Sequence, residues 1–191
     1  FSKAIETDPN YARAYAWKAC STATCAQWNP GHYGVNWLED CLDYVNQAIE
    51  IDPDDAEVHR ILGAIRMFKS EFDASLYHHE KARDLCPSDA YIRFKYATVL
   101  IYVGNPERAL KEIIAAKRLD PFLPDYLLED EGICYFWLNK FDEALESFGT
   151  LKVPSRNSLF YRAAAFGKKG EISYAKTSLA EAVSVTNMTI S

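Results

Sequence analysis

Three prolines recur at an even spacing, and this spacing constrains the fold more than any other feature of the chain. Pro53, Pro87 and Pro121 follow one another at intervals of 34 residues. Each closes a stretch with helical periodicity, in the related sequences Ala48-Ile-Glu-Ile-Asp-Pro53, Ala82-Arg-Asp-Leu-Cys-Pro87 and Ala116-Lys-Arg-Leu-Asp-Pro121. A fixed period of about 20–50 residues is typical of a repeat array rather than of one closed core. We therefore expect units that stack on their neighbours along the chain.

Each unit contains two predicted helices joined by a short turn. In one unit, apolar residues at helical spacing predict a first helix over Ala90–Val103 and a second over Pro106–Arg118. Gly104 ends the first helix, and Pro106 fits the first turn of the second. The residue before a proline is disfavoured in a helix, so the second helix ends before Pro121. The predicted fold is all-α, built from antiparallel helix pairs.

The same pattern extends over residues 1–191, which we predict to form a single array. The other expected helices are Phe1–Glu6, Ala12–Ala26, Trp37–Ile51, Ala56–Phe68, Phe72–Leu85, Asp125–Leu138, Phe141–Leu151, Ser158–Lys168 and Glu171–Val185. The predicted parts are the end of a truncated repeat (1–11), a repeat with an inserted loop at 27–36 (12–55), three further repeats (56–89, 90–124 and 125–155) and a degenerate C-terminal repeat (156–191). Because the chain lacks an initiator Met, we expect a fragment of a longer protein.

Small residues recur at fixed places in both helices of the repeat. Those near the middle of first helices are Gly63, Ala97, Gly132 and Ala163, and those early in second helices are Ala109, Ala144 and Ala175, with Ser75 at the matching place in one unit. Two helices approach closely only where their side chains are small. These positions are therefore predicted contact points between paired helices.

Together, these features resemble the tetratricopeptide repeat (TPR) family. The 34-residue period, the mid-helix Gly or Ala, the early Ala of the second helix and the closing Asp-Pro all match, while Ser75 and Asn187 depart from the usual Ala and Pro. The resemblance implies a right-handed α-solenoid, the TPR superhelix. It also implies that first helices line a concave groove, and that the chain is a protein-interaction module rather than an enzyme.

A narrower resemblance covers three segments of the chain. The segments Asp8–Trp17, Ala116–Asp125 and Tyr161–Ala165 look like the C-terminal repeat region of bacterial class III adenylate/guanylate cyclases and of some winged-helix regulators. This resemblance implies the regulatory, protein-binding part of a larger cytoplasmic signalling protein. Nothing in the chain resembles the catalytic domain of a cyclase.

Within the expected groove, helical phase selects an aromatic surface with mixed charges. The selected residues are Arg13, Trp17, Arg60, Tyr91, Phe94, Lys95, Thr98, Tyr102, Tyr126, Glu129, Asp130, Phe136, Trp137, Phe160 and Tyr161. Aromatic residues with a few charges are the usual energetic anchors of an interface. The expected ligand is an extended peptide or a helix with apolar anchors. The alternative for each residue is core packing between helices.

Composition excludes several other classes of partner. The net charge of −6 and a pI near 5.3 argue against nucleic-acid binding, which requires a basic stripe. No apolar run approaches the about 18 residues of a membrane span. No Gly-rich phosphate loop or nucleophile motif is present, so we expect no cofactor and no catalytic residue. The alternative function is self-association, with a homodimer that oligomerises a larger cytoplasmic enzyme or regulator.

Neither the cysteines nor the histidines have the spacing of a metal site. Cys20, Cys25, Cys41, Cys86 and Cys134 are an odd set, for which we expect free, mostly buried thiols in a reducing cytoplasm. His78 and His79 are adjacent in a predicted helix and point about 100° apart, so they do not share one ion. His59 and His32 have no partner at ligand spacing.

The insertion at 27–36 has two interpretations that the sequence leaves open. It contains Trp28, His32 and Tyr33 among Gly, Pro and Asn residues that favour a loop. An exposed loop with these side chains is a candidate contact site. The other interpretation is a helix extension that caps the stack.

Overall fold

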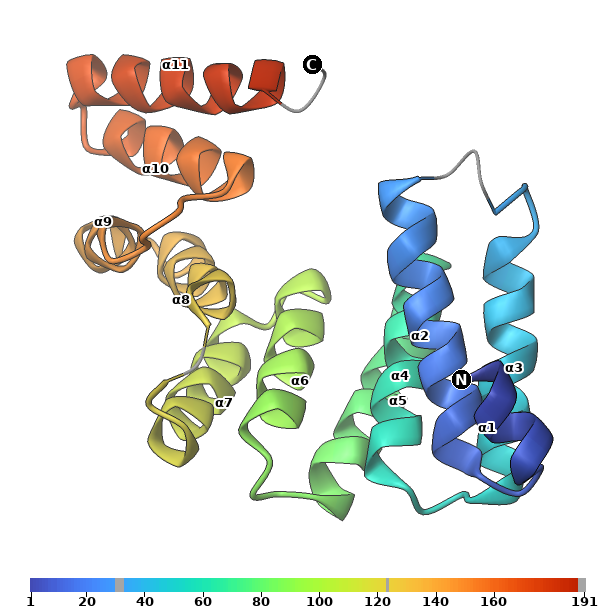
Figure 1. Ribbon diagram of the computed structural model, residues 1–191. Coiled ribbons are helices and arrows are strands. Elements are labelled where there is room, and N and C mark those ends of the chain that lie inside the picture. The colour runs from blue at the N-terminus through green and yellow to red at the C-terminus, as the bar shows by residue number, and fades with distance from the viewer. Residues whose placement is uncertain (30–32, 123, 189–191) are drawn as a thin grey trace. The chain divides into compact units, whose positions relative to one another are not determined.

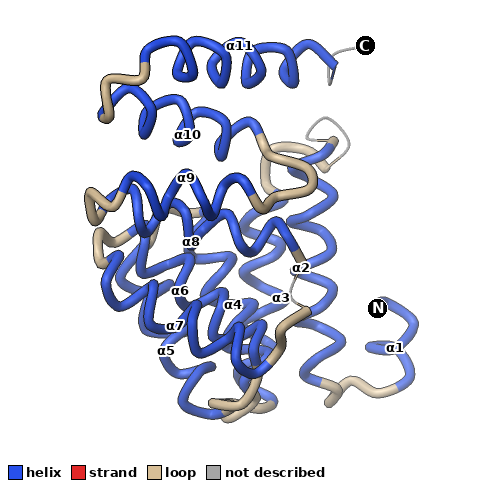
Figure 2. Tube along the Cα trace, turned by 90° about the vertical axis from the view of Figure 1, so that its left-hand side faces the viewer, coloured by secondary structure: helices blue, strands red, loops and turns tan. Residues whose placement is uncertain are grey.

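The computed structural model describes residues 1–29, 33–122 and 124–188, without the side chains of Trp28, Asp125, Tyr126 and residues 186–188. In these ranges every regular element is a helix, as Figure 2 shows. The helices are α1 (Ser2–Thr7), α2 (Ala12–Trp28), α3 (Trp37–Ile51), α4 (Ala56–Phe68), α5 (Phe72–Leu85), α6 (Ala90–Tyr102), α7 (Pro106–Leu119), α8 (Asp125–Trp137), α9 (Phe141–Gly149), α10 (Arg156–Lys168) and α11 (Ile172–Met188). None of the helices described is long and apolar enough to cross a membrane.

The chain divides into two compact units, Phe1–Val99 and Leu100–Ser191, and the division falls within α6. In unit 1, α2 pairs with α3 and α4 pairs with α5, while α4 also packs against α2 and α3 (Figure 1). In unit 2, α8 pairs with α9 and α10 pairs with α11, while α10 also contacts α8 and α9. Each unit is thus a stack of helix pairs, as expected for the fold class. One continuous array over residues 1–191 remains a prediction.

The repeated prolines end the second helices in the way that the sequence predicts. The residues before them, Asp52, Cys86 and Asp120, leave the helical conformation, with φ of −138°, −136° and −136°. Their helices end one residue earlier, because the proline ring disfavours helical backbone in the residue before it. Asp120 Oδ1 also accepts a hydrogen bond of 2.9 Å from the backbone N–H of Phe122, which fixes the turn locally.

The turn between the two helices of a repeat contains one residue with left-handed backbone. Ser70, Gly104, Asn139 and Gly170 have φ of 61°, 78°, 59° and 79° at matching places in four repeats. Gly adopts this conformation without steric cost, whereas a residue with a Cβ is strained there by roughly 1 kcal/mol. Ser70 is thus a strained turn residue at a place where two other repeats have Gly.

We expect Ser70→Gly to raise the free energy of unfolding by about 1 kcal/mol, because it removes the Cβ from a left-handed position. The reciprocal change, Gly104→Ala, is expected to lower it by about the same amount, since open space around Gly104 leaves the backbone as the only source of strain. Urea denaturation of both variants measures these changes. A loss of stability in Ser70→Gly would contradict the assignment.

Two of the predicted close contacts between paired helices are present, one in each unit, and they are similar. A Cβ added to Gly63 would lie 2.3 Å from His79 Nδ1, and one added to Gly132 would lie 2.5 Å from Phe148 Cε1. Each ring therefore packs directly on the backbone of the first helix. His79 occupies in unit 1 the place that Phe148 occupies in unit 2, four residues after a fully buried small residue of the second helix.

Some predicted helix ends differ from the structure. Helix α2 continues to Trp28 rather than Ala26, so it includes the first two residues of the predicted insertion. Helix α9 ends at Gly149 rather than Leu151, and α11 continues to Met188 rather than Val185. His32 lies outside the described residues, so the structure tests neither interpretation of the insertion in full.

All five cysteines are free, but the expectation that most are buried was wrong. Only Cys41 and Cys134 are buried, and Cys25 is exposed on the last turns of α2. Burial raises the pKa of Cys41 to about 11 and that of Cys134 to about 12. Both thiols are therefore protonated at neutral pH and act as small apolar core residues.

Candidate functional site

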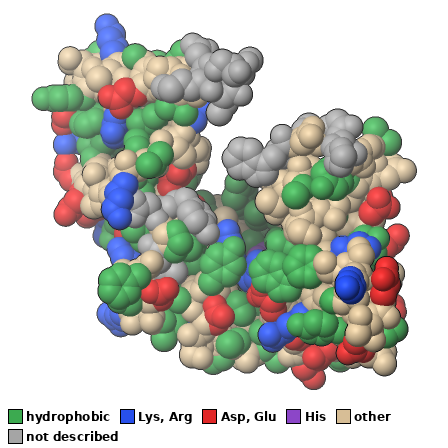
Figure 3. All heavy atoms as spheres, viewed as in Figure 1, with side chains coloured by type: hydrophobic (Ala, Val, Ile, Leu, Met, Phe, Trp, Pro, Cys, Tyr) green, Lys and Arg blue, Asp and Glu red, His purple; other side chains and the backbone are tan. Residues whose placement is uncertain are grey.

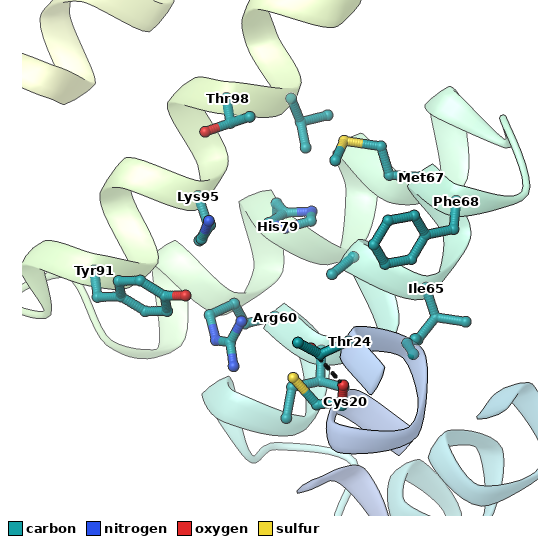
Figure 4. Close-up of a pocket in the computed structure, with 14 residues that line it drawn as sticks. Cys20, Thr24, Arg60, Ile65, Met67, Phe68, His79, Tyr91, Lys95 and Thr98 are labelled. Atoms are coloured by element: carbon teal, nitrogen blue, oxygen red, sulfur yellow. Dashed lines mark hydrogen bonds between the residues drawn. The ribbon is translucent and has the colours of Figure 1, made fainter. Parts of the chain in front are cut away.

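Residues of four helices line a pocket of about 190 Å³ within unit 1. First helices α2, α4 and α6 provide most of its wall, and α5 contributes His79 (Figure 4). The lining residues are Cys20, Ala23, Thr24, Arg60, Ile61, Ala64, Ile65, Met67, Phe68, His79, Tyr91, Lys95, Thr98 and Val99. Most of this lining is apolar, and the basic side chains come from α4 and α6. The pocket has the makeup of a binding site, with apolar walls and few polar groups.

Cations and aromatic rings alternate at one side of this pocket. The Arg60 guanidinium carbon lies 5.7 Å from the ring centroid of Trp17 and 5.1 Å from that of Tyr91. Lys95 Nζ lies 5.3 Å from the Tyr91 centroid. We call these four residues the rim. Figure 3 shows hydrophobic side chains gathered on this face of unit 1, with basic side chains beside them. Cation–π contacts of this kind hold the rings in place before any ligand binds.

Arg60 is the buried member of the rim. Its side chain is only 4% exposed and forms two hydrogen bonds of 2.7 Å with the Glu57 carboxylate. Burial by itself lowers the pKa of Arg60, but the bonds and charge of Glu57 outweigh burial and the net shift is upward. Arg60 thus remains charged while it orients the two rings that it touches.

A second, wider depression of about 340 Å³ adjoins the rim in unit 1 and shares Trp17 and Tyr91 with it. Arg13 lines this depression and pairs with Asp55, the N-cap residue of α4. Burial raises the pKa of Asp55, but the hydrogen bonds from Arg13 and two backbone N–H groups lower it by more. The net shift of this pKa is therefore downward. The depression presents charges of both signs, because Glu57 and Asp89 also line it.

The predicted groove residues of unit 1 divide into exposed, supporting and core positions. Trp17 and Tyr91 are 38% and 37% exposed, and Lys95 is half-buried at the pocket. Phe94 was wrong as a contact residue, because it is fully buried. Three residues along a helix turn a side chain by about 60° from Tyr91, which brings Phe94 into the core, where a large ring gains most from burial.

Three of the predicted groove residues of unit 2, Phe136, Trp137 and Tyr161, form an aromatic cluster. Phe136 and Tyr161 are half-buried with centroids 5.2 Å apart, and Tyr161 also stacks on Phe148. Trp137, Tyr102 and Phe160 are exposed. The side chain of Tyr126 lies outside the described part of the chain. Helices α6, α8 and α10 thus present aromatic side chains within unit 2.

The acidic residues at 129–131 form polar contacts between helices of unit 2. Glu129 accepts a hydrogen bond of 2.9 Å from Asn157 Nδ2 of α10, and Glu131 forms an ion pair of 2.8 Å with Lys117 of α7. Asp130, the third acid and a predicted contact residue, is half-buried. At least two of the three carboxylates therefore hold neighbouring helices, so the run is not a pair of acids poised for proton transfer.

One histidine pair was missed by the sequence analysis, which gave His59 no partner. His59 Nδ1 lies 3.0 Å from His78 Nδ1, and His59 Nε2 lies 2.9 Å from the Pro53 carbonyl oxygen. Because a carbonyl only accepts, His59 Nε2 carries a proton and His59 Nδ1 accepts from His78. Burial, followed by the charge of His59, lowers the pKa of His78 to about 4. Among the described residues, no group of three ligating side chains could hold a metal ion.

The ring of His79 was not assigned to the site either, yet it lines the pocket. His79 is 2% exposed, and Nδ1 lies 2.9 Å from the backbone carbonyl oxygen of Ser75. Burial is the main cause that lowers the pKa of His79 to about 4. The imidazole is therefore neutral at neutral pH. Its membership of the site depends on how α5 packs against α4, which the sequence does not reveal.

Solved structures with TPR folds resemble this chain over most of its length. YrrB, described as a TPR protein with an unusual peptide-binding site, is 21% identical with a TM-score of 0.66, and the match covers 97% of this chain and 91% of YrrB. PilF of Pseudomonas aeruginosa is 19% identical with a TM-score of 0.71, over 90% and 76% of the two chains. MamA of Desulfovibrio magneticus RS-1 is 13% identical with a TM-score of 0.69, over 91% and 96%.

These likenesses establish the fold class that the proline period predicts, an all-α TPR solenoid. At such identities the likeness concerns the fold alone. No protein-family model and no curated protein sequence matches the chain. The resemblance to the repeat region of bacterial cyclases stays a prediction.

Proposed function

We propose that the chain is a non-catalytic protein-interaction module whose first helices bind an extended peptide or a segment of a partner protein. The observation that carries the proposal is the pocket between α2, α4 and α6, with the rim of Trp17, Arg60, Tyr91 and Lys95 beside it. The TPR fold supports it, and YrrB is one protein of this fold that is described as having a peptide-binding site.

The chemistry of the rim suits a peptide. Aromatic rings that are already held by cations provide apolar contact area at little cost in conformational entropy. An extended peptide presents backbone carbonyl oxygens, which accept hydrogen bonds from cationic side chains such as Lys95, while alternate side chains project to one face. One of these side chains can enter the pocket. The exposed aromatic residues of α8 and α10 are proposed to bind a further part of the same partner.

We expect Tyr91→Ala to weaken binding of a peptide by at least about tenfold, because it removes the ring shared by the pocket and the depression beside it. The peptide would be selected by phage display on the whole chain, and its affinity measured by calorimetry. Tyr77→Ala is the matched control, since Tyr77 is also exposed but lies on the second helix α5. Equal affinity for Tyr91→Ala and wild type, at unchanged helicity, would contradict the proposed surface.

Trp137→Ala and Tyr102→Ala test the proposed extension of the surface to unit 2. Both residues are more than half exposed, at 57% and 64%, so their loss is expected to leave the circular dichroism spectrum unchanged. We expect both variants to bind a long partner segment more weakly. Their affinity for a short peptide that fills only the pocket of unit 1 is expected to be unchanged. Unchanged affinity for both would confine the binding surface to unit 1.

We also propose that this module is the regulatory part of a larger bacterial cytoplasmic signalling protein. The support is the sequence resemblance of Asp8–Trp17 and two further segments to cyclase repeat regions. The test is to fuse the chain to a class III cyclase domain and to measure cyclase activity with and without the selected peptide. A peptide-dependent change in rate is expected, and its absence would count against a regulatory role.

The second candidate function is self-association, and the exposed face of α11 favours it. Ile172, Leu179 and Val183 share one side of this helix and are each roughly half exposed. Clustered apolar side chains on a surface are typical of protein–protein contacts. Light scattering over a range of concentrations would detect a homodimer, which Leu179→Glu is expected to dissociate. A monomer mass at every concentration would argue against this candidate.

A further inference from the structure

The pocket of unit 1 has enough volume to hold an aromatic ring. Its volume of about 190 Å³ exceeds the roughly 150 Å³ of an engineered apolar cavity that binds benzene. Ile61, Ile65 and Val99 form buried apolar parts of the wall. A side chain the size of a phenyl ring with one added substituent therefore matches this space, whereas a small hydroxyl side chain would leave most of it empty.

His79 provides a hydrogen-bond acceptor in this wall. Its Nδ1 lies 2.9 Å from the Ser75 carbonyl oxygen, which only accepts, so Nδ1 carries the ring proton. The neutral ring then has a lone pair on Nε2, and none of the described residues donates a hydrogen bond to that atom. Figure 4 shows the ring among the pocket side chains, between Lys95 and Phe68. An acceptor that faces the pocket loses its contact with water when the pocket is filled, so an occupant that donates to it is favoured over one that does not.

The charges beside the pocket restrict the occupant further. Arg60 and Lys95 both line the pocket and both lie over the ring of Tyr91. Two positive charges repel an ammonium or guanidinium group and attract the face of an aromatic ring. A carboxylate is not repelled by these cations, but it has no proton to donate to His79 and loses its water among the apolar walls. An uncharged aromatic side chain with a donor that reaches His79 therefore fits best. Among peptide side chains of the right size, tyrosine has these properties.

We propose that the pocket binds a tyrosine side chain of the partner peptide, with the phenol hydroxyl donating a hydrogen bond to Nε2 of His79. This inference rests on the proposed function of unit 1 and specifies the residue that the partner contributes. His79 acts as the specificity residue, because phenylalanine has the same ring but leaves the acceptor unsatisfied.

The pocket can be tested without a partner, with p-cresol as the analogue of the tyrosine side chain. We expect p-cresol to bind the whole chain about tenfold more tightly than 4-fluorotoluene, which has a similar shape and no donor. Imidazole nitrogen NMR of His79 is expected to shift at Nε2 and not at Nδ1. Equal binding of the two compounds, or no binding of p-cresol, would overturn the proposal while leaving the surface tested by Tyr91→Ala unaffected.

Peptides then test whether the phenol comes from a tyrosine. Phage display on the whole chain is expected to return peptides with one fixed tyrosine, and Tyr→Phe in the peptide is expected to weaken binding about tenfold. The His79→Phe variant, which copies the Phe148–Gly132 contact of unit 2, should bind both peptides equally. Should this variant fail to fold, His79→Gln, which keeps an acceptor, should retain the preference. Selected peptides without tyrosine, or with no loss on Tyr→Phe, would refute the proposal even if Tyr91→Ala abolishes their binding.

Discussion

Gly63→Ala is expected to lower the free energy of unfolding by about 2–3 kcal/mol, because the added methyl group overlaps the His79 ring. The new Cβ would lie 2.3 Å from Nδ1 and 2.5 Å from Cε1 of that ring. The ring cannot move aside cheaply, since Nδ1 is bonded to the Ser75 carbonyl and Ser75 is fully buried. Chemical denaturation measures the loss. It should appear in the midpoint, with little change in the denaturant slope.

Two other glycines provide matched comparisons for this substitution. Gly132→Ala is expected to cost a similar amount, because its Cβ would lie 2.5 Å from Phe148 Cε1. Gly167→Ala on α10 is the control, since a Cβ there meets open space and Ala favours helix by roughly 1 kcal/mol. In a double-mutant cycle, His79→Ala is expected to relieve part of the cost of Gly63→Ala. Additive effects of the two changes would show that the clash is not the cause.

The second large effect expected is a loss of stability in mild acid that depends on His79. Burial lowers the pKa of His79 to about 4, with Arg60, Lys95 and His78 adding to the shift, against about 6.5 for an unfolded chain. Between these values the unfolded chain binds a proton that the folded chain does not. Stability therefore falls as the pH drops from about 6.5 to about 4, by an amount on the order of 3 kcal/mol for this group.

Thermal or urea denaturation between pH 7 and pH 4 measures this loss in the wild type and in His79→Phe. The variant is expected to fold, because Phe148 makes the same contact with Gly132, and to lose the part of the pH slope that His79 contributes. A further slope should remain from His78, which is half-buried and whose pKa is also lowered to about 4. Ion-paired carboxylates such as Asp55 add to the loss at lower pH, where they protonate. Parallel pH profiles for wild type and variant would contradict the assignment to His79.

Local signals were enough to predict the helices and their order. A proline restricts the residue before it, so Asp52, Cys86 and Asp120 end their helices whatever surrounds them. The left-handed turn residues lie where the sequence places short polar turns, such as Gly104 between α6 and α7. Small residues at Gly63 and Gly132 predicted close helix contacts, because only a missing side chain permits them.

The candidate site could be predicted from the sequence only in part. Helical phase predicted that Trp17, Tyr91 and Lys95 belong to the surface of the first helices, and in unit 1 they lie at one pocket or its edge. The same phase included Phe94, which is fully buried. A shift of about 60° around a helix separates a core position from a surface position, and this lies within the error of assigning a face by periodicity.

What the sequence determined by itself is therefore the repeat: its period, its helix ends, its turns and the places where helices touch, all of which depend on residues close together in the chain. Only the tertiary structure decided that His59 meets His78 across 19 residues, that Arg60 lies between Trp17 and Tyr91, and that His79 of α5 lines a pocket walled mainly by α2, α4 and α6. These contacts join different helices, and their geometry depends on how closely the helices pack. That distance is set by side-chain volumes at the interface, such as the absence of a side chain at Gly63 beneath the His79 ring.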